Sequence, residues 1–565
     1  MLQTIKSISV LLIAMLFSLL YYTSNAQVVA PNGMVVSSNA VASQVGVDIL
    51  KKGGNAIDAA IATAFALAVT HPTAGNIGGG GFLVFMKSTG EVTTIDFREK
   101  APFAATPTMF LDTKGKLPKN NNHEGLKTVG VPGTVAGLYL AHQKYGKLTW
   151  AGLVQPAVDL AKNGFIMPKG LFNDATKLLA AEDTNQFIQN YFRNSESKIT
   201  PIGKIWKQAA LAKTLETIRD KGKDGFYKGE IAQEIADFMQ KNGGIITLKD
   251  LESYTAIERK PIKGKYKQFD IYSMSPPSSG GLALVEMLNM MELANLDSIP
   301  FNSTEYLHLL AEVMRRAYAD RAEYLGDPDF NIEMPLDKLT SKEFAIMRFG
   351  NLDRKRASIS DSSAFGHPYD GNNTTHFSVA DKDGNAVSLT YTLEYAYGSR
   401  LGDEKLGFIF NNEIGDFNPV PGITNRKGQI GTSPNLIAPE KRMLSSMTPT
   451  IVSKNGKPYL IIGSPGGRTI INTVFQTVVN VLAYEMSIDK AIEAMKIHHQ
   501  WLPDEIVYEK NLMPSKSRKD LEKLGHKTKA VNNLGSLMGI TYDEKLKVFV
   551  GAADTSSPDG AAVGY

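Results

Sequence analysis

Apolar residues recur at helical spacing in several long stretches of the chain. In residues 55–69 they fall at Ile57, Ile61, Ala64 and Ala68, about one helical turn apart. Because most side chains of this stretch are small, we expect its helix to pack closely against a sheet. By the same reasoning we predict helices over residues 39–50, 55–69, 303–325 and 473–495.

Paired apolar runs around short turn sequences predict β-hairpins between these helices. Each turn carries residues such as Asp-Gly or Asn-Gly, which favour tight reversals between strands. Antiparallel hairpins alternating with helices indicate sheets covered by helices, an α+β layered fold. The predicted hairpins span residues 82–96, 375–393, 450–462 and 538–551.

The N-terminus has the pattern of an export signal. Lys6 precedes an apolar run at residues 8–22, and the small residues Ser24-Asn25-Ala26 follow it. A membrane anchor is the alternative, but the run is short for a hydrocarbon core of roughly 30 Å. We therefore expect residues 1–26 to be a removed signal peptide and the mature protein to be periplasmic or secreted, with no membrane association.

Composition excludes several classes of function. The 565 residues include 61 basic and 57 acidic side chains, and the basic ones are scattered, which argues against a nucleic-acid partner. The chain has no cysteine, so disulfides and thiolate nucleophiles are excluded. Nine histidines are present, and we interpret the adjacent pair His498-His499 as structural, with no metal and no cofactor expected.

A polar segment directly precedes a predicted strand. Residues 358–373 are rich in Ser, Asp, Gly and Asn, which is typical of an exposed, cleavable loop. If the chain is cut before Thr374, the new α-amine has an ordinary pKa of about 7.7–8.0. Thr374 would then carry both a nucleophilic hydroxyl and a general base.

The hairpin that follows brings a second threonine beside Thr374. If Asp383-Gly384 form a two-residue turn, Thr375 faces Thr392 and Thr374 faces Leu393. Thr392 would then lie within hydrogen-bond reach of Thr374. From the pattern alone, both threonines also fit a simple role as good strand formers.

A glycine-rich loop follows the predicted strand at residues 459–462. Gly463-Ser464-Pro465-Gly466-Gly467 exposes backbone N–H groups and lets a ligand approach closely, as an oxyanion hole requires. The same residues also fit an ordinary strand-to-helix turn. The loop is not a G-x-S-x-G elbow, because Pro465 stands at the middle position.

Several long motifs, in order along nearly the whole mature chain, resemble those of the gamma-glutamyltranspeptidase family. The segment from Thr374 to Val387 is similar to the family's self-processing signature. The other motifs are Gly53-Gly54-Asn55-Ala56-Ile57-Asp58-Ala59-Ala60, Gly75-Asn76-Ile77-Gly78-Gly79-Gly80-Gly81-Phe82, Asp96-Phe97-Arg98-Glu99, Leu444-Ser445-Ser446-Met447 and the loop 463–467.

This resemblance implies a four-layer αββα Ntn-hydrolase sandwich. It implies that Thr374 attacks the preceding carbonyl and cuts the bond after Asn373. The precursor would give a large subunit, residues 27–373, and a small subunit, residues 374–565. Thr374 would then take a γ-glutamyl group from glutathione or another γ-glutamyl compound and pass it to water, an amino acid or a dipeptide.

The resemblance also implies roles for individual residues. Thr392 would hydrogen-bond the nucleophile, and Gly466 and Gly467 would hold the oxyanion. The implied donor-binding set is Arg98, Ser445 and Ser446 for the α-carboxylate, with Glu394, Glu413 and Asp416 for the α-ammonium group.

Two positions depart from the pattern of many relatives. Glu394 stands where many have Asn, which concentrates negative charge and predicts raised carboxyl pKa values and weaker donor binding at acidic pH. Residues 418–440 are long enough for the substrate-covering lid, but the lid's aromatic position falls near Lys427, so gating by that residue is not expected.

Two other functions remain open from the sequence. A related acylase, for example one acting on cephalosporin side chains, would share the fold and the nucleophile. A non-catalytic binding protein would neither cleave itself nor depend on Thr374. Retention of the whole amino-acid-binding set favours the transpeptidase and glutathione hydrolase.

Overall fold

The computed structural model describes residues 27–119, 121–180, 184–194, 196–331, 333–360, 374–422 and 431–565. Three regions named above therefore lie outside the described residues: the expected signal peptide, Asn373 with most of the expected cleavable loop, and Lys427. Within the described part of the chain, none of the helices combines the length and apolar character needed to cross a membrane.

Thr374 lies at the start of a central strand in the first of two seven-stranded sheets. All neighbouring strands in this sheet run antiparallel. Their spatial order is β19 (Ala561–Gly564), β2 (Gly33–Ser37), β10 (Thr374–Asp381), β11 (Ala386–Thr392), β3 (Gly80–Met86), β4 (Val92–Phe97) and β7 (Ile257–Arg259).

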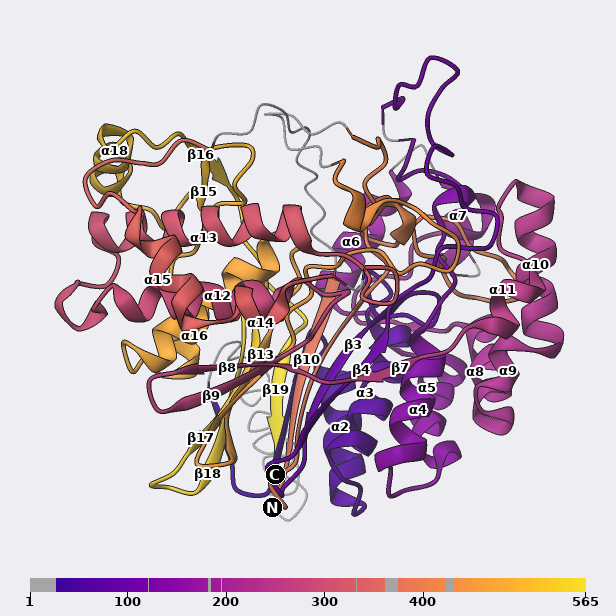
Figure 1. Cartoon of the computed structure of the whole chain (residues 1–565). Helices are drawn as coiled ribbons and strands as arrows, with labels where there is room; N and C mark the ends of the chain where they lie inside the picture. Colours follow the sequence, from indigo (N-terminus) through magenta and orange to yellow (C-terminus); the bar gives the residue numbers. More distant parts are fainter. Residues whose placement is uncertain are drawn as a thin grey trace, which may run out of the picture.

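The second sheet is also antiparallel and faces the first across a shared core (Figure 1). Its spatial order is β1 (Val28–Ala30), β18 (Val548–Ala553), β17 (Met538–Asp543), β13 (Lys457–Gly463), β12 (Thr450–Lys454), β9 (Phe269–Ser273) and β8 (Ile262–Tyr266).

Helices cover the outer face of each sheet, so the molecule has four layers (Figure 1). The layer on the first sheet contains α2 (Ala40–Lys51), α3 (Ala56–Thr70), α4 (Thr134–Tyr145) and α5 (Trp150–Asn163). The layer on the second sheet contains α12 (Gly280–Leu293), α13 (Thr304–Tyr324), α16 (Thr469–Leu482) and α17 (Ile488–Glu493).

Shorter elements surround these layers. The remaining α-helices are α6 (Lys169–Leu179), α7 (Gln186–Tyr191), α8 (Ala209–Lys221), α9 (Asp224–Tyr227), α10 (Gly229–Asn242), α11 (Leu248–Ser253), α14 (Leu336–Leu339), α15 (Lys342–Gly350) and α18 (Ser515–Lys523). The remaining strands are β5 (Phe165–Ile166), β6 (Ile205–Trp206), β14 (Ile497–His498), β15 (Ile506–Glu509) and β16 (Thr528–Val531). Single turns of 3₁₀-helix are η1 (Leu126–Thr128), η2 (Leu296–Ser298), η3 (Glu413–Asp416) and η4 (Ser433–Asn435).

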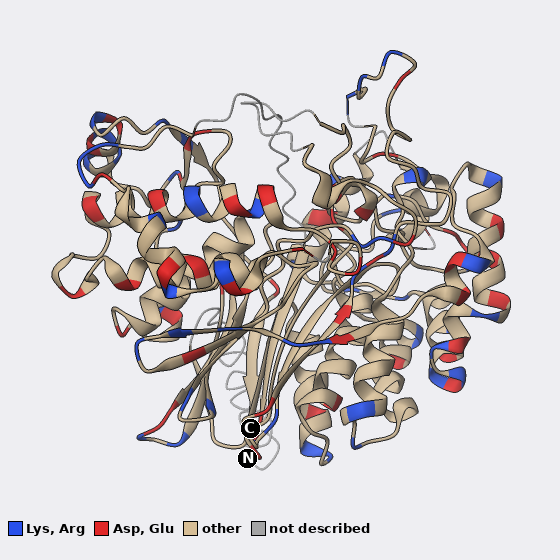
Figure 2. Cartoon of the chain, in the orientation of Figure 1, with Lys and Arg blue, Asp and Glu red and all other residues tan. Residues whose placement is uncertain are grey.

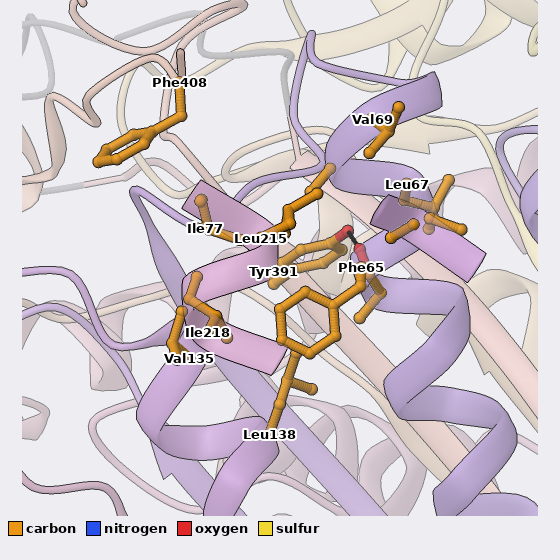
Figure 3. Packing of buried hydrophobic residues seen from close by; sticks show 14 of the residues in the cluster. Phe65, Leu67, Val69, Ile77, Val135, Leu138, Leu215, Ile218, Tyr391 and Phe408 are labelled. Atoms are coloured by element: carbon orange, nitrogen blue, oxygen red, sulfur yellow. Dashed lines mark hydrogen bonds between the residues drawn. The ribbon is translucent and has the colours of Figure 1, made fainter. Parts of the chain in front are cut away.

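The predicted alanine-rich helix is α3, and it lies against the first sheet. All of its residues are buried, and Asn55 and Asp58 form a reciprocal capping box at its start. Figure 3 shows Phe65 packed among apolar side chains from α4 and α8, with the Tyr391 hydroxyl donating a hydrogen bond to the Ala64 carbonyl (2.9 Å). Burying each such aromatic side chain contributes roughly 1.5–3 kcal/mol to folding.

The alternation along β10 determines which way Thr374 points. Phe377 and Val379 pack into the helix-covered core, whereas Ala380 packs into the core between the sheets. Side chains two residues apart share a face of a strand, so Thr374 points with Ala380 toward the second sheet.

All four predicted hairpins are present, but the predicted pairing of Thr375 with Thr392 and of Thr374 with Leu393 was wrong by one residue. Thr374 pairs directly with Thr392, and Thr375 pairs with Tyr391. The turn has three residues rather than two, because Asp381 pairs with Asn385 and Gly384 adopts φ 89° in the left-handed region. The shift brings the two threonines closer than predicted.

The long helix predicted over residues 473–495 was also wrong, because the chain breaks it in two. Helix α16 ends at Leu482, and α17 begins at Ile488. Between them Glu485 adopts φ 51°, and the Met486 N–H bonds the Asn480 carbonyl (3.1 Å). The apolar pattern continues across the break, which is why periodicity alone did not detect it.

Candidate active site

Thr374 and Thr392 form the centre of the candidate site. The Thr374 hydroxyl donates to the Thr392 hydroxyl oxygen over 3.3 Å, and the Glu394 N–H donates to the same oxygen over 2.8 Å. Thr374 is only 8% exposed. The Thr392 hydroxyl is thus held between the candidate nucleophile and the backbone that follows β11.

Asn76, which the sequence reasoning did not single out, holds the backbone of Thr392. Its amide nitrogen donates to the Thr392 carbonyl (2.9 Å), and its oxygen accepts from the Gly79 N–H (2.9 Å) and the Thr134 hydroxyl (2.8 Å). A Cβ on Gly79 would lie 2.0 Å from the Thr392 carbonyl oxygen, so this approach requires glycine. The motif Gly75-Asn76-Ile77-Gly78-Gly79 was the available signal, but its partner lies more than 300 residues away.

The glycine loop lies at the same end of the sheets as Thr374. The His376 ring contacts Gly463, the last residue of β13, where an added Cβ would lie 2.4 Å from the ring. Beyond Gly463, Gly466 adopts φ 138° and Gly467 adopts φ 54° before α16 begins. Both backbone angles favour glycine, and they are compatible with N–H groups turned toward a ligand.

Arg98, Glu413 and Asp416 form a buried ionic cluster. One Nη of Arg98 donates to Glu413 and the other to Asp416, while Nε donates to the Met443 carbonyl (3.3 Å). The guanidinium is fully buried. The structure thus brings together the residue expected to bind the donor's carboxylate and two of those expected to bind its ammonium group.

Glu394 approaches this cluster from the end of β11. It is 8% exposed and adopts φ 77°, a left-handed conformation that is uncommon for a residue with a side chain. Its Oε2 lies 3.7 Å from Nδ1 of His123, whose ring stacks on Tyr395. Such local strain is typical of functional sites.

Burial dominates the electrostatics of these acids. It raises the pKa of the Glu394 carboxyl well above its usual range, and the neighbouring Asp416 raises it further. Burial also raises the pKa of Glu413 despite the opposing charge of Arg98, and it raises the pKa of Glu99 to about 8. The predicted direction is confirmed, but desolvation rather than repulsion between carboxylates is the larger cause.

Ser445 and Ser446 directly follow Met443 and Leu444, whose carbonyls accept hydrogen bonds from Arg98. The Ser445 hydroxyl accepts from the Met447 N–H (3.1 Å), and the Ser446 hydroxyl accepts from Arg321 Nη2 (3.1 Å). Both serines are at least 90% buried. Sequence reasoning missed Arg321, which belongs to α13 and has no motif of its own.

Both rings of the pair His498-His499 contact polar side chains of the protein. His498 Nδ1 pairs with the Asn472 amide (2.8 Å), and His499 Nε2 lies 3.3 Å from Asp504. These contacts support a structural role for both rings.

A different group, His308, Glu312 and His526, has the spacing of a metal site. The Glu312 oxygens, however, already accept hydrogen bonds from Arg316 (2.7 Å) and the Ser358 N–H (3.0 Å). Two hydrogen bonds to this carboxylate and a nearby guanidinium make it a poor cation ligand.

A family model described as Gamma-glutamyltranspeptidase matches residues 42–564. The chain belongs to the gamma-glutamyltranspeptidase family. It is 45% identical over 544 residues to the glutathione hydrolase proenzyme of Escherichia coli (strain K12), covering 95% of this chain and 92% of that protein. It is 40% identical over 560 residues to the proenzyme of Bacillus subtilis (strain 168), covering 95% and 92%.

Solved structures agree with this assignment and with the layered architecture. A cephalosporin acylase from Bacillus halodurans superimposes with a TM-score of 0.83 at 26% identity, covering 96% of this chain and 98% of that chain. The gamma-glutamyltranspeptidase of Helicobacter pylori gives a TM-score of 0.56 at 42% identity, covering 60% of this chain and 95% of that chain. The predicted αββα Ntn-hydrolase fold is confirmed, and the chain is an enzyme of this family.

Proposed function

We propose that this protein is a self-processing γ-glutamyltransferase and glutathione hydrolase with Thr374 as its nucleophile. The observation that carries the proposal is the buried Thr374 hydroxyl at the start of a central strand, hydrogen-bonded over 3.3 Å to Thr392. The names of the relatives, glutathione hydrolase proenzymes, support the substrate and the processing.

Processing divides the chain between Asn373 and Thr374. The Thr374 hydroxyl attacks the Asn373 carbonyl carbon, an ester replaces the peptide bond, and water then hydrolyses that ester. The products are a large subunit of residues 27–373, ending in a carboxylate, and a small subunit of residues 374–565, beginning with a free α-amine. Removal of residues 1–26 during export would leave the enzyme periplasmic or secreted.

Turnover uses the amine that processing releases. The Thr374 α-amine accepts the hydroxyl proton as Oγ1 attacks the γ-carbonyl carbon of the donor. The backbone N–H groups of Gly466 and Gly467 bind the oxyanion, and Thr392 fixes the attacking hydroxyl. Collapse transfers the proton to the departing amine and leaves a γ-glutamyl ester on Thr374. Water or the amine of an amino acid or dipeptide then attacks this ester.

The donor's charged end is bound by the cluster beyond Thr392. Ser445 and Ser446, with Arg98, bind the α-carboxylate, and Glu394, Glu413 and Asp416 bind the α-ammonium group. The ionic contacts between Arg98 and the two acids support this arrangement, because they bring the opposite charges of an amino acid's binding site together. No cofactor or metal is needed for this acyl transfer.

Assay of a γ-glutamyl anilide with wild-type protein and the variant Thr374→Ala tests the proposal. The wild type should release the aniline and a glutamyl product, and Thr374→Ala should lose at least about 10³-fold in kcat because no other nucleophile replaces the hydroxyl. Equal turnover by both proteins would contradict the proposal.

An acylase acting on cephalosporin side chains is the second candidate. The long superposition with the Bacillus halodurans acylase favours it. The amino-acid-binding acids Glu413 and Asp416 oppose it, since a side chain without an ammonium group would not neutralise them. Faster hydrolysis of a glutaryl amide than of the matching γ-glutamyl amide would support the acylase.

A further inference from the structure

Helix α13 presents two polar side chains to the candidate site. Tyr318 and Arg321 are three residues apart and therefore lie on one face of the helix. The Tyr318 hydroxyl donates to the carbonyl of Arg468, directly after the proposed oxyanion glycines. Arg321 Nη2 donates to the Ser446 hydroxyl (3.1 Å). Helix α13, from the proposed large subunit, thus contacts both Arg468, which follows the glycine loop, and Ser446 in the proposed small subunit.

Arg321 is a buried cation without a neutralising partner in the described structure. It is 7% exposed, and its Nε donates to the Ser279 hydroxyl (2.8 Å). Among the described residues no carboxylate lies within 4.0 Å of its guanidinium, whereas Arg315 and Arg316 of the same helix both pair with Glu312. Among the described residues its side-chain hydrogen bonds go to the hydroxyls of Ser279 and Ser446, and a buried charge held in this way is costly, so the site is suited to an anion.

Arg98, in contrast, has three carboxyl groups within 4.0 Å, those of Glu99, Glu413 and Asp416. Its Nη atoms are both occupied, one by Glu413 and the other by Asp416. A donor carboxylate that approached Arg98 alone would meet a guanidinium whose charge two acids already offset. Arg321 has no carboxyl partner within the part of the chain that the structure describes, and the Ser446 hydroxyl it contacts is one that the proposed function assigns to carboxylate binding.

We infer that Arg321 is a positioning and specificity-determining residue, which orients the Ser446 hydroxyl and supplies the uncompensated positive charge that selects donors with an α-carboxylate. The inference rests on the proposed function. Because Arg321 donates to Ser446 Oγ, the hydroxyl proton of Ser446 is free to point away from the guanidinium and toward the ligand. The carboxylate would then receive a hydrogen bond polarised by the cation behind it.

Two donors that differ only in the α-carboxylate test this role. They are a γ-glutamyl anilide and the corresponding 4-aminobutanoyl anilide. For Arg321→Gln we expect the KM of the γ-glutamyl anilide to rise by about 10- to 100-fold with kcat changed less than about threefold. The kcat/KM of the 4-aminobutanoyl anilide should stay within about twofold of wild type, and Arg321→Lys should recover part of the loss.

Arg348→Gln is the matched control. Arg348 pairs with Asp320, the neighbour of Arg321 on α13, and its described side-chain partners, Asp320 and Phe344, lie outside the candidate site. We expect Arg348→Gln to change the kcat/KM of both donors by the same factor. The competitive inhibition constants of glutamate and 4-aminobutanoate, measured against the γ-glutamyl anilide, give the same comparison with ligands that are not themselves turned over. They can be measured with Arg321→Lys if the glutamine variant does not fold.

An equal loss for both donors in the Arg321 variants would overturn the inference, since it would indicate a structural role only. A selective loss for the donor with the carboxylate would support it. A wild-type protein that turns over neither donor would contradict the proposed function itself and would thereby remove the basis of this inference.

Discussion

At the scale of single residues, Glu394 combines three features that bear on the candidate site. Its backbone is left-handed, its N–H supports Thr392, and its carboxyl is buried beside Asp416. In the role proposed above, an incoming ammonium group would favour the ionised form of this carboxyl. Glu394 would then connect Thr392 to donor binding.

Donor binding should weaken as the pH falls. The raised pKa values of Glu394 and Glu413 mean that both carboxyls gain protons at a higher pH than ordinary glutamates, and a neutral carboxyl does not pair with an ammonium ion. We expect the donor KM to rise by about tenfold between about pH 9 and pH 5, and Glu394→Gln to raise KM at pH 9 while flattening this dependence. Steady-state kinetics across this range measure it.

Glu343→Gln, at an exposed residue, serves as the control, and we expect its donor KM to depend on pH as in the wild type. A donor KM that is constant over the whole range in the wild type would contradict the role of these acids.

At the scale of elements, the hairpins and capped helices were predictable because their signals are local. Asn55 caps α3, and Gly384 turns the hairpin between β10 and β11. The contacts that complete the site were not predictable from local patterns. Asn76 reaches Thr392 and Arg321 reaches Ser446 across long separations in sequence. The sequence placed Arg98 and Glu413 in one binding site only through the family resemblance, and no local pattern predicted their contact.

The contact between His376 and Gly463 joins the strand of the nucleophile to the strand that leads to the glycine loop. A methyl group added at Gly463 would lie 2.4 Å from the buried ring, so Gly463→Ala should force the two strands apart. We expect a stability loss of about 1–3 kcal/mol and a fall of at least tenfold in kcat with little change in KM. Denaturant unfolding and steady-state kinetics measure the two effects.

Gly350→Ala is the control, because the space around that residue is open within 4 Å. Wild-type kcat in Gly463→Ala would show that the position of the glycine loop does not depend on this contact.

A buried acid between α12 and α13 gives a test of stability. Burial raises the pKa of Glu286 well above its usual range, with Asp320 raising it further. The folded protein therefore binds a proton that the unfolded chain has lost at neutral pH, and stability falls as the pH rises from the ordinary glutamate pKa toward the raised one. Glu286→Gln should remove this loss, so its advantage over wild type in thermal unfolding should grow from pH 6 to pH 9. If the stability advantage of Glu286→Gln over wild type shrinks between pH 6 and pH 9, the raised pKa of Glu286 is contradicted.

At the scale of the whole molecule, both expected subunits contribute strands to both sheets. The first sheet takes β2, β3, β4 and β7 from residues 27–373, and β10, β11 and β19 from residues 374–565. Lys, Arg, Asp and Glu are interspersed over the outer helices, while the central strands carry few of them (Figure 2). Cleavage would therefore leave two chains that share continuous hydrogen-bonded sheets and apolar cores.

The two fragments should stay together after cleavage. We expect a single species of about the full mass in size-exclusion chromatography and one cooperative unfolding transition, because each of the two seven-stranded sheets takes strands from both fragments. Separation of the fragments without denaturant would contradict this shared core.

Intact-mass spectrometry of the denatured protein, with N-terminal sequencing of the smaller fragment, tests the central claim most directly. For the wild type we predict two chains, the smaller beginning Thr-Thr-His-Phe-Ser at Thr374, and for Thr374→Ala a single uncleaved chain. A wild-type protein that is fully active as one continuous chain, or a smaller fragment that begins at another residue, would contradict the account.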